Sequence, residues 1–588
     1  MPKKAVQMMK PYQPPTAGRL GKRRLDFNEN TLGCSSRVLA RLKKITVEDC
    51  AVYPEYTLLK KQLARSVAVA ENEVLPTNGT DEAIKCIIDT FLEKGDEIII
   101  PIPTYSMFRI YAEIAEAKIT YVLYNNDLSF PIEKLLKAIT DTTRLVVLVN
   151  PNNPTGTPIL QESIRAIIEK TKKGMVLVDE AYYQYNGVSC KDLIKQYKNL
   201  IVLQTFSKVF GLAGLRMGYI LSDAENIRVL AKVLSPYSVN IFASILAGEA
   251  LKDKQFVDDY IAETSKSKVM LAKALQEWGF MVYPSSTNFV VVNFGKSYQR
   301  IYTLLKDRRI LVRDVSSYPL LENCLRITLG TVKQTTYFLK ELKQIIQPKA
   351  LLFDMDGVLV DVSNSYRTAI KKTVAYFSGE VISNEKIQEF KNRGGFNNDG
   401  DLTEAILLSS GKKINKKEIK KLEIIKQFQR YYLGNDLGNN KKLQKIFDGL
   451  INNERWLVDK KVLTTLRKKY RLGIVTGRPR REAAYALKRA GVSSYFKCVV
   501  TLDETKGREK PDAYPLQCAL EQLKVINAIY VGDAIDDYQA ATNAGITFIG
   551  CIPPQLSTAS MLTLKKRFRG RGVTKIIDDI NKISEVLP

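Results

Sequence analysis

Short apolar runs alternate with amphipathic segments along the first part of the chain. From about residue 74 to 222 the apolar runs have the length of strands, and apolar residues with the period of a helix recur between them. The runs are EIIIPIP, ITYVLY, RLVVLVN, GMVLVDEAYY, LIVLQTFSK and RMGYIL. This alternation predicts an α/β fold with a largely parallel sheet, in which ligands bind at the carboxyl ends of the strands.

The same pattern begins a second time after the midpoint. The segment TTYFLKELKQIIQ (335–347) has the period of an amphipathic helix, and Pro348 marks its end. KALLFDMDGVLVD (349–361) then leads from apolar residues through two alternate aspartates into a glycine turn. Further apolar runs follow at 471–475 and 528–532. A second α/β unit is therefore expected.

The chain has 588 residues, which is too many for one hydrophobic core. We expect one domain over 26–347 and another over 348–588. Residues 1–25 contain no acidic residue and no apolar signal segment, so they are predicted to form a basic flexible leader. A mostly helical, lysine-rich stretch over about 366–457 is predicted to form a cap on the second domain.

The composition gives no support for a nucleic-acid-binding, membrane-spanning or disulfide-rich protein. The formal net charge is +27, but Lys and Arg are mixed with acidic residues on helical patterns such as 412–426, as on a solvated surface. No apolar stretch approaches the roughly 18 residues of a membrane helix. The eight cysteines form no CxxC pair. We expect a cytoplasmic protein that binds neither nucleic acid nor a membrane.

The chain contains no histidine. Every general acid or base must therefore be a carboxylate, Lys, Tyr or Cys, and triads of the Ser/His/Asp type are excluded. Natural selection and deliberate engineering would both produce the same absence of histidine, so the sequence does not distinguish them.

Four motifs follow strands of the first domain. LPTNGTDEAIKCII (75–88) places a glycine turn before a helix, an arrangement that suits a phosphate. VLVDEAYYQY (176–185) ends a buried strand with Asp179, whose charge needs a cationic partner. NPNNPTG (150–156) is rich in turn residues, and QTFSKVFGLAGLRMGY (204–219) carries a lysine and an arginine.

In their order along the chain (75–88, 150–156, 176–185 and 204–219), the four motifs resemble those of the pyridoxal-phosphate aminotransferases of the aspartate-aminotransferase fold, from about Asp26 to Gln347. Within that family the chain is most similar to histidinol-phosphate aminotransferases. The segments that carry this likeness are DFNENTLG (26–33), YPEY (53–56), PTYSMF (103–108) and CLRITLGT (324–331). The resemblance implies a type I fold with a large parallel-sheet domain and a small C-terminal α/β domain, pyridoxal 5'-phosphate as cofactor, and a homodimer.

The resemblance also implies roles for single residues. Lys208 would link to the cofactor aldehyde and transfer protons, and Asp179 would pair with the protonated pyridine nitrogen. The other cofactor contacts would be Gly79, Thr80, Tyr105, Asn153, Tyr182, Thr205, Ser207, Arg216 and, from the neighbouring subunit, Tyr53. Arg313 and Arg326 would bind the anionic group of the substrate. Threonine-phosphate decarboxylases and aromatic or aspartate aminotransferases share the cofactor residues, so the substrate stays open at this point.

The second domain carries four further elements, DMDG (354–357), TGRP (476–479), EKPD (509–512) and GDAIDD (532–537). Together they resemble the phosphatases of the haloacid-dehalogenase superfamily, whose core is Rossmann-like. The resemblance makes Asp354 the nucleophile and Asp356 the acid and base, two roles that an extended DxD can serve from one side. Thr476 and Lys510 would bind the phosphoryl group, and Asp354, the Asp356 carbonyl, Asp533 and Asp537 would hold Mg²⁺.

A short linker between two such enzymes predicts consecutive steps. The hypothesis is that the chain transaminates imidazole-acetol phosphate with glutamate, giving histidinol phosphate and 2-oxoglutarate, and then hydrolyses the phosphate. The alternative is an aminotransferase of another substrate fused to a phosphoglycolate-type or broad-specificity phosphatase. Phosphorylated small molecules are the expected partners in both cases.

Overall fold

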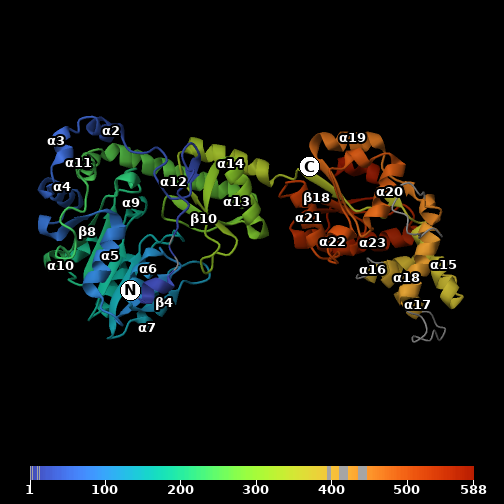
Figure 1. Cartoon of the computed structure of the whole chain (residues 1–588), viewed down its shortest axis with the longest axis horizontal. Coiled ribbons are helices and arrows are strands. Elements are labelled where there is room, and N and C mark those ends of the chain that lie inside the picture. Colours follow the sequence, from blue (N-terminus) through green and yellow to red (C-terminus); the bar gives the residue numbers. More distant parts are fainter. Residues whose placement is uncertain are drawn as a thin grey trace. The chain divides into compact units, whose positions relative to one another are not determined.

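The protein is described from a computed structural model, which covers residues 2, 4–9, 11, 13–393, 399–409, 421–434 and 447–587. The chain divides into two compact units, Met1–Gln344 and Ile345–Pro588. Figure 1 shows the elements of both. None of the helices in the described ranges has both the length and the apolar character needed to cross a membrane.

The first unit contains a seven-stranded sheet. Its spatial order is β2 (Val74–Thr77), β8 (Gly218–Ser222), β7 (Leu200–Thr205), β6 (Met175–Asp179), β5 (Thr143–Val149), β3 (Glu97–Ile102) and β4 (Lys118–Leu123). The pairs from β7 to β4 are parallel, and β8 is antiparallel to both of its neighbours. The carboxyl ends of β5, β6 and β7 therefore meet at one edge.

Helices cover both faces of this sheet, and its central strands carry buried apolar residues on both faces. On β5, Val146 and Leu148 belong to one core cluster and Leu145 and Val147 to another. The first cluster is completed by α4 (Thr57–Val67), α7 (Ile132–Ala138), α8 (Gln161–Lys170) and α11 (Ile241–Ala250). The second is completed by α5 (Gly79–Phe91), α6 (Met107–Ile114) and α10 (Ala224–Leu230). Such continuous apolar strands are typical of a parallel sheet that is buried on both sides.

A smaller, five-stranded sheet completes the first unit. It has the order β1 (Arg23–Leu25), β11 (Ile310–Asp314), β12 (Cys324–Thr328), β10 (Phe289–Asn293) and β9 (Met281–Val282). Its helices are α13 (Tyr298–Asp307) and α14 (Val332–Ile346), and the long α12 (Lys254–Glu277) comes immediately before β9 in the chain (Figure 1). The remaining short helices are α1 (Lys4–Met8), α2 (Ser36–Leu42), α3 (Val47–Ala51) and α9 (Tyr183–Asn186).

The start of this sheet differs from the sequence prediction of a flexible leader over 1–25. Arg23–Leu25 pair in parallel with Ile310–Val312, and Leu25 is buried. Arg19 forms ion pairs with Asp26 and Glu29 at 2.7 and 2.9 Å. A run as basic as RRL gives little strand signal by itself, and only the edge of β11 provides its hydrogen bonds.

The second unit is a Rossmann-like core with a helical insertion. All strand pairs of its six-stranded sheet are parallel. The order is β17 (Cys498–Val500), β16 (Arg471–Val475), β13 (Ala350–Phe353), β18 (Ala528–Gly532), β19 (Thr547–Cys551) and β20 (Ile576–Ile577). Its helices are α19 (Lys460–Lys469), α20 (Arg480–Ala490), α21 (Tyr514–Gln522), α22 (Ile535–Ala544) and α23 (Thr558–Gly570). The strand order reverses at β13, where such sheets bind ligands.

The insertion contains α15 (Tyr366–Ser378), α16 (Asn384–Arg393), α17 (Asp399–Leu408) and α18 (Lys421–Leu433). Ile370, Ile406 and Phe428 belong to its shared apolar core. Two short antiparallel strands, β14 (Val360–Asp361) and β15 (Arg455–Trp456), lie where the chain leaves and re-enters the sheet domain. Residues 394–398, 410–420 and 435–446 of the predicted cap, which include part of the segment 412–426, lie outside the described residues.

Candidate active sites

The first site lies at the carboxyl ends of β6 and β7. Asp179 is the last residue of β6, and Lys208 follows β7 by three residues. The two strands are adjacent and parallel, with Asp179 level with Leu203. The parallel register therefore brings the lysine and the aspartate to the same edge of the sheet.

Asp179 is a carboxylate in an apolar setting. Only 3% of the residue is exposed, and burial raises its pKa to about 7. The backbone N–H of Ala181 donates to its Oδ1 at 3.0 Å. A protonated pyridine nitrogen would supply the missing positive charge, so this residue fits the cofactor that the resemblance implies.

Lys208 is held close to an aromatic ring. Its Nζ donates to the carbonyl of Phe27 at 3.1 Å and lies 5.4 Å from the centre of the Tyr182 ring. The buried hydroxyl of Tyr182 accepts a hydrogen bond from Asn28 Nδ2 at 3.0 Å. Asn28, which the sequence analysis did not single out, has a φ of 57°, a conformation that Asn tolerates well.

A polar cradle forms at the N-terminus of α5. Gly79 has a φ of 77°, and a β-carbon there would lie 2.6 Å from Nη2 of Arg216. Arg216 Nη1 reaches Ser207 Oγ at 3.5 Å, and Thr205 Oγ1 donates to the same hydroxyl at 2.9 Å. The free N–H groups of α5, beginning at Gly79 and Thr80, and the guanidinium suit a phosphate dianion.

Asp81 joins two of the predicted residues through its side chain, a role that the sequence motif around Gly79 did not predict. Its Oδ1 accepts from the Tyr105 hydroxyl at 2.8 Å, and its Oδ2 accepts from Arg216 Nη2 at 2.9 Å. Its place in the first turn of a helix allowed a simpler interpretation as a favourable helix-dipole residue. The structure adds that Asp81 fixes both side chains beside Gly79.

Two arginines lie side by side on the small sheet. Arg313 on β11 is level with Arg326 on β12. Arg326 is buried, with Nη2 donating to the carbonyl of Asp26 at 2.7 Å and Nη1 donating to Asn153 Oδ1. Arg313 lies 5.7 Å from the ring of Phe27. The contact with Asn153 connects the small sheet to the turn after β5.

Tyr53 is not brought into the site by its own chain. It is 77% exposed and stacks on Tyr237, with ring centres 4.4 Å apart. Val52 and Leu58 are also exposed beside it in the sequence. The role that the resemblance implies for Tyr53 requires a second subunit.

The shifted pKa of Asp179 predicts a pH effect on the cofactor-free protein. Because the folded state binds this proton more tightly than the unfolded state, stability falls as the pH rises from about 4 to about 7. Asp179→Asn removes this loss. From pH 5 to pH 8 the free energy of unfolding of the variant should rise relative to wild type by about 2–3 kcal/mol, at two pKa units of 1.36 kcal/mol each. Denaturant titrations of both proteins measure it, and parallel pH curves would contradict it.

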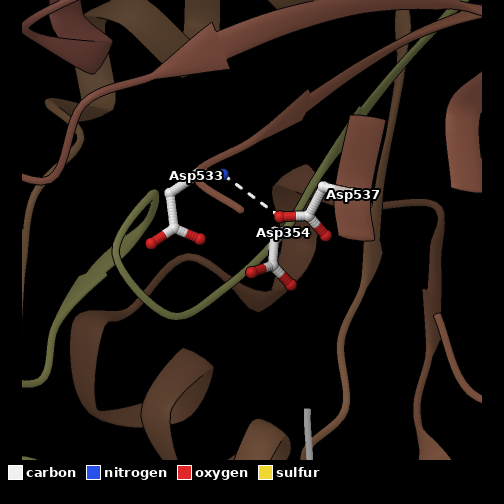
Figure 2. A group of neighbouring side chains, drawn as sticks. All are labelled: Asp354, Asp533 and Asp537. Carbon is white, nitrogen blue, oxygen red and sulfur yellow. Dashed lines mark hydrogen bonds between the residues drawn. The ribbon is translucent and has the colours of Figure 1, made fainter. Parts of the chain in front are cut away.

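The second site lies at the switch point of the Rossmann-like sheet. Figure 2 shows Asp354 after β13, Asp533 after β18 and Asp537 on α22. Carboxylate oxygens of the three residues lie within 4.8 Å of one another. Hard oxygen ligands so close together fit Mg²⁺.

Lys510 binds two of these carboxylates. Its Nζ donates to Asp354 Oδ1 at 2.9 Å and to Asp537 Oδ1 at 2.6 Å. Tyr530 also donates to Asp537 Oδ1, and the backbone N–H groups of Asp533 and Ala534 donate to its Oδ2. Both oxygens of Asp537 are therefore held by other groups of the chain, which orient this carboxylate beside Asp354 and Asp533.

The carboxyl of Asp354 is strongly perturbed. Its pKa is raised to about 7, mainly by burial and also by the carboxylates of Asp537 and Asp356, while Lys510 acts in the opposite direction. Gly357 allows the turn after it, with a φ of 80° and a position where a β-carbon would lie 2.3 Å from Asp533 Oδ2. The glycine of DMDG thus lets the turn approach the carboxylate of Asp533.

Asp356 is paired with a buried arginine that carries no role in the sequence analysis. Arg478 donates to Asp356 Oδ1 from Nε at 2.8 Å and from Nη2 at 2.5 Å. It also forms two hydrogen bonds to buried Glu454, at 3.0 and 2.8 Å. The backbone N–H of Arg478 donates to Thr476 Oγ1 at 3.2 Å. The TGRP motif therefore places a phosphate-binding candidate and the partner of Asp356 on one turn.

Glu454 connects this pair to the cap. Its Oε1 accepts hydrogen bonds from Tyr432 of α18 at 2.9 Å and from Ser365, just before α15, at 3.2 Å. Asp354, Asp356, Thr476 and Lys510 all border one pocket of about 210 Å³, which cap residues also line. The cap is thus tied by hydrogen bonds to the arginine that holds Asp356.

Removing Arg478 leaves two carboxylates without their shared cation. We expect Arg478→Met to lower the free energy of unfolding of the second unit by about 3 kcal/mol or more, because breaking a buried ion pair strands its partner. Adding Glu454→Gln should recover part of the stability but not the phosphatase rate, since Asp356 still lacks its positioning contact. Thermal unfolding and phosphate release measure the two effects. Full recovery of both by the double variant would contradict the positioning role.

Comparisons with known proteins match each unit separately. Residues 21–342 match the family model for aminotransferases of class I and II, and residues 351–551 match the model for haloacid dehalogenase-like hydrolases. A histidinol-phosphate aminotransferase of Thermoanaerobacter sp. (strain X514) is 37% identical over 329 residues, which cover 55% of this chain and 93% of that protein.

Solved structures agree with the first match. The histidinol-phosphate aminotransferase of Sinorhizobium meliloti, in complex with pyridoxal-5'-phosphate, is 25% identical with a TM-score of 0.54, covering 58% of this chain and 96% of its own. The L-threonine-O-3-phosphate decarboxylase of Porphyromonas gingivalis is also 25% identical, with a TM-score of 0.50, over 55% of this chain and 98% of its own.

Proposed function

Since the chain belongs to the aminotransferases of class I and II and carries a haloacid dehalogenase-like hydrolase domain, we propose that it catalyses two consecutive steps of histidine synthesis. The first unit would transfer the amino group of glutamate to imidazole-acetol phosphate. The second would hydrolyse the resulting histidinol phosphate to histidinol and phosphate. The observation that carries the proposal is the fusion of a unit similar to histidinol-phosphate aminotransferases with a phosphatase-type site.

In the first unit the residues of the chain bind, orient and transfer a proton. Pyridoxal 5'-phosphate supplies an aldehyde for the amino group and a ring that accepts electrons. Asp179 would hold the protonated ring nitrogen, and Tyr182 with Asn153 would orient the ring oxygen. Lys208 would carry the proton between the substrate carbon and the cofactor, a task that a primary amine at the end of a flexible chain can perform.

We propose that the anionic group of the substrate binds beside Arg313 and Arg326. These two residues lie level on adjacent strands, and the guanidinium of Arg326 is oriented by hydrogen bonds to Asp26 and Asn153. A carboxylate or phosphate suits such groups because each guanidinium can donate two hydrogen bonds. We propose that glutamate and the phosphorylated substrate use this pair in turn.

In the second unit the substrate phosphorus would be attacked by Asp354. Asp356 would protonate the leaving alkoxide and then accept a proton from the water that hydrolyses the aspartyl phosphate. Lys510 and Thr476 would hold the phosphoryl oxygens. Mg²⁺, held by Asp354, Asp533 and the Asp356 carbonyl with Asp537 nearby, would neutralise charge on the phosphate.

We also propose that the first unit forms a homodimer. Val52, Tyr53, Leu58 and Tyr237 are all exposed, and a second subunit would cover this apolar surface and bring Tyr53 to the partner's cofactor phosphate. All eight cysteines are free thiols, which supports a reducing, cytoplasmic location.

The proposal is tested by supplying both substrates of the first step with Mg²⁺. The purified chain should form 2-oxoglutarate and phosphate in equal amounts, with histidinol as the final product. An Asp354→Asn variant should accumulate histidinol phosphate instead. Formation of 2-oxoglutarate without phosphate release from the wild type would contradict the two-step proposal.

A further inference from the structure

The pocket around Asp354 is negatively charged although the chain as a whole is basic. Among the described residues that line it, six are carboxylates and two are cations. The two cations are already committed: Lys510 to Asp354 and Asp537, and Arg478 to Asp356 and Glu454. The charges of Mg²⁺ and of a phosphate dianion would cancel, so this excess of negative charge would persist in the substrate complex.

Two of the six carboxylates have no role in the phosphoryl transfer proposed above. Glu482 lies in the first turn of α20, and Glu509 immediately precedes Lys510. No hydrogen bond or ion pair joins the Glu509 carboxylate to any residue in the described part of the chain. It is half-buried, and burial raises its pKa. Asp401 on α17, which is paired with Lys421, adds to this rise, and Lys510 acts in the opposite direction. Lys510 is already bound to Asp354 and Asp537, so Glu509 makes no direct contact with a cation in the described part of the chain.

The side chains that the cap contributes to the pocket are mainly aromatic and aliphatic, with Gln429 as a polar member. Ile425 and the stacked rings of Phe428 and Tyr432, whose centres are 5.6 Å apart, line it together with Tyr366. The pocket therefore combines the aspartates around Asp354 with aromatic and aliphatic cap residues and with Glu509, a carboxylate without a direct cationic contact in the described part of the chain.

We propose that Glu509, together with Glu482, binds a cationic group of the substrate, so that the second unit selects phosphate monoesters of amines and disfavours esters that carry a second anion. The inference rests on the proposed phosphatase function of this pocket. A protonated amine would give Glu509 a direct cationic partner, whereas a substrate carboxylate beside Glu509 would be repelled by it. The cap wall would hold the organic part of the ester.

Three esters of similar size and different charge test this selection. Phosphoethanolamine carries an ammonium group, ethyl phosphate carries no second charge, and phosphoglycolate carries a carboxylate. With Mg²⁺, kcat/KM of the full chain should fall in that order, by roughly tenfold or more at each step, since a hydrogen bond to a charged group is worth about that much. The expected difference lies mainly in KM.

Variants assign the effect to named residues. Glu509→Gln should lower kcat/KM for phosphoethanolamine roughly tenfold further than for ethyl phosphate, and Glu482→Gln should act in the same direction. Glu509→Lys should raise kcat/KM for phosphoglycolate relative to kcat/KM for ethyl phosphate. Glu521→Gln changes an exposed acidic residue outside the pocket and should leave the ratios of kcat/KM among the three esters unchanged.

The outcomes separate this inference from the function on which it rests. Hydrolysis of ethyl phosphate as fast as phosphoethanolamine, or equal losses for both esters in Glu509→Gln, would overturn cation selection and leave a phosphatase. Absence of hydrolysis of all three esters and of histidinol phosphate would overturn the phosphatase function itself, and the inference with it.

Discussion

Lys208→Ala should abolish transamination while phosphate release continues. The amine is the proposed covalent anchor of the cofactor and the proton carrier, and no histidine exists in the chain to substitute for it. We expect kcat to fall by about 10⁴-fold or more, the upper range for loss of a positioned acid or base. The cofactor's visible absorption should lose its lysine-linked form. Formation of 2-oxoglutarate and release of phosphate from histidinol phosphate are measured on the same preparation.

Lys232→Ala is the matched control, because Lys232 is exposed on the same unit. It should leave both activities unchanged. Residual transamination within tenfold of wild type in Lys208→Ala would contradict the assignment of this lysine.

Asp354→Asn should have the reciprocal effect. The amide keeps the shape of the side chain and its contact distance to Lys510, but it cannot attack phosphorus and it offers a poorer metal ligand. Phosphate release should fall by about 10⁴-fold or more, the order seen when a nucleophile is removed. Transamination should be unchanged, because its residues lie in the other compact unit.

The Asp354→Asn variant should also avoid the free-energy cost of burying the carboxylate charge of Asp354. Its cofactor-loaded first unit serves as an internal control for folding, and a thermal unfolding curve checks the second unit. Loss of both activities would indicate a folding defect, whereas phosphate release near the wild-type rate would contradict the nucleophile assignment.

Residues at strand ends were the easiest part of the sites to predict. Asp179, Lys208 and Asp354 each lie at or just after the end of an apolar run. Because neighbouring parallel strands run in the same direction, their carboxyl ends lie at the same edge of the sheet. The sequence pattern therefore predicted that these residues gather at the carboxyl ends of neighbouring strands without any long-range information. The order of motifs added the resemblance to two families, and the matched models agree with it.

Residues whose partners are distant in sequence could not be predicted in the same way. Arg478 lies 122 positions from Asp356 and 24 from Glu454, and nothing local marks it as buried. Asp81 was equally hidden, because a first-turn aspartate has an ordinary local explanation. The strand at Arg23–Leu25 depends on the edge of β11, which is almost 300 residues further along the chain.

The central claim is that the second unit removes the phosphate from the product of the first. The most direct measurement is kcat/KM for phosphate release from histidinol phosphate by the purified chain with Mg²⁺, beside phosphoglycolate. We predict a preference for histidinol phosphate of at least about 100-fold, in keeping with the loss of a charged contact and the gain of a repulsive one. Equal rates, or a preference for phosphoglycolate, would contradict the claim and leave an aminotransferase fused to a phosphatase of unrelated purpose.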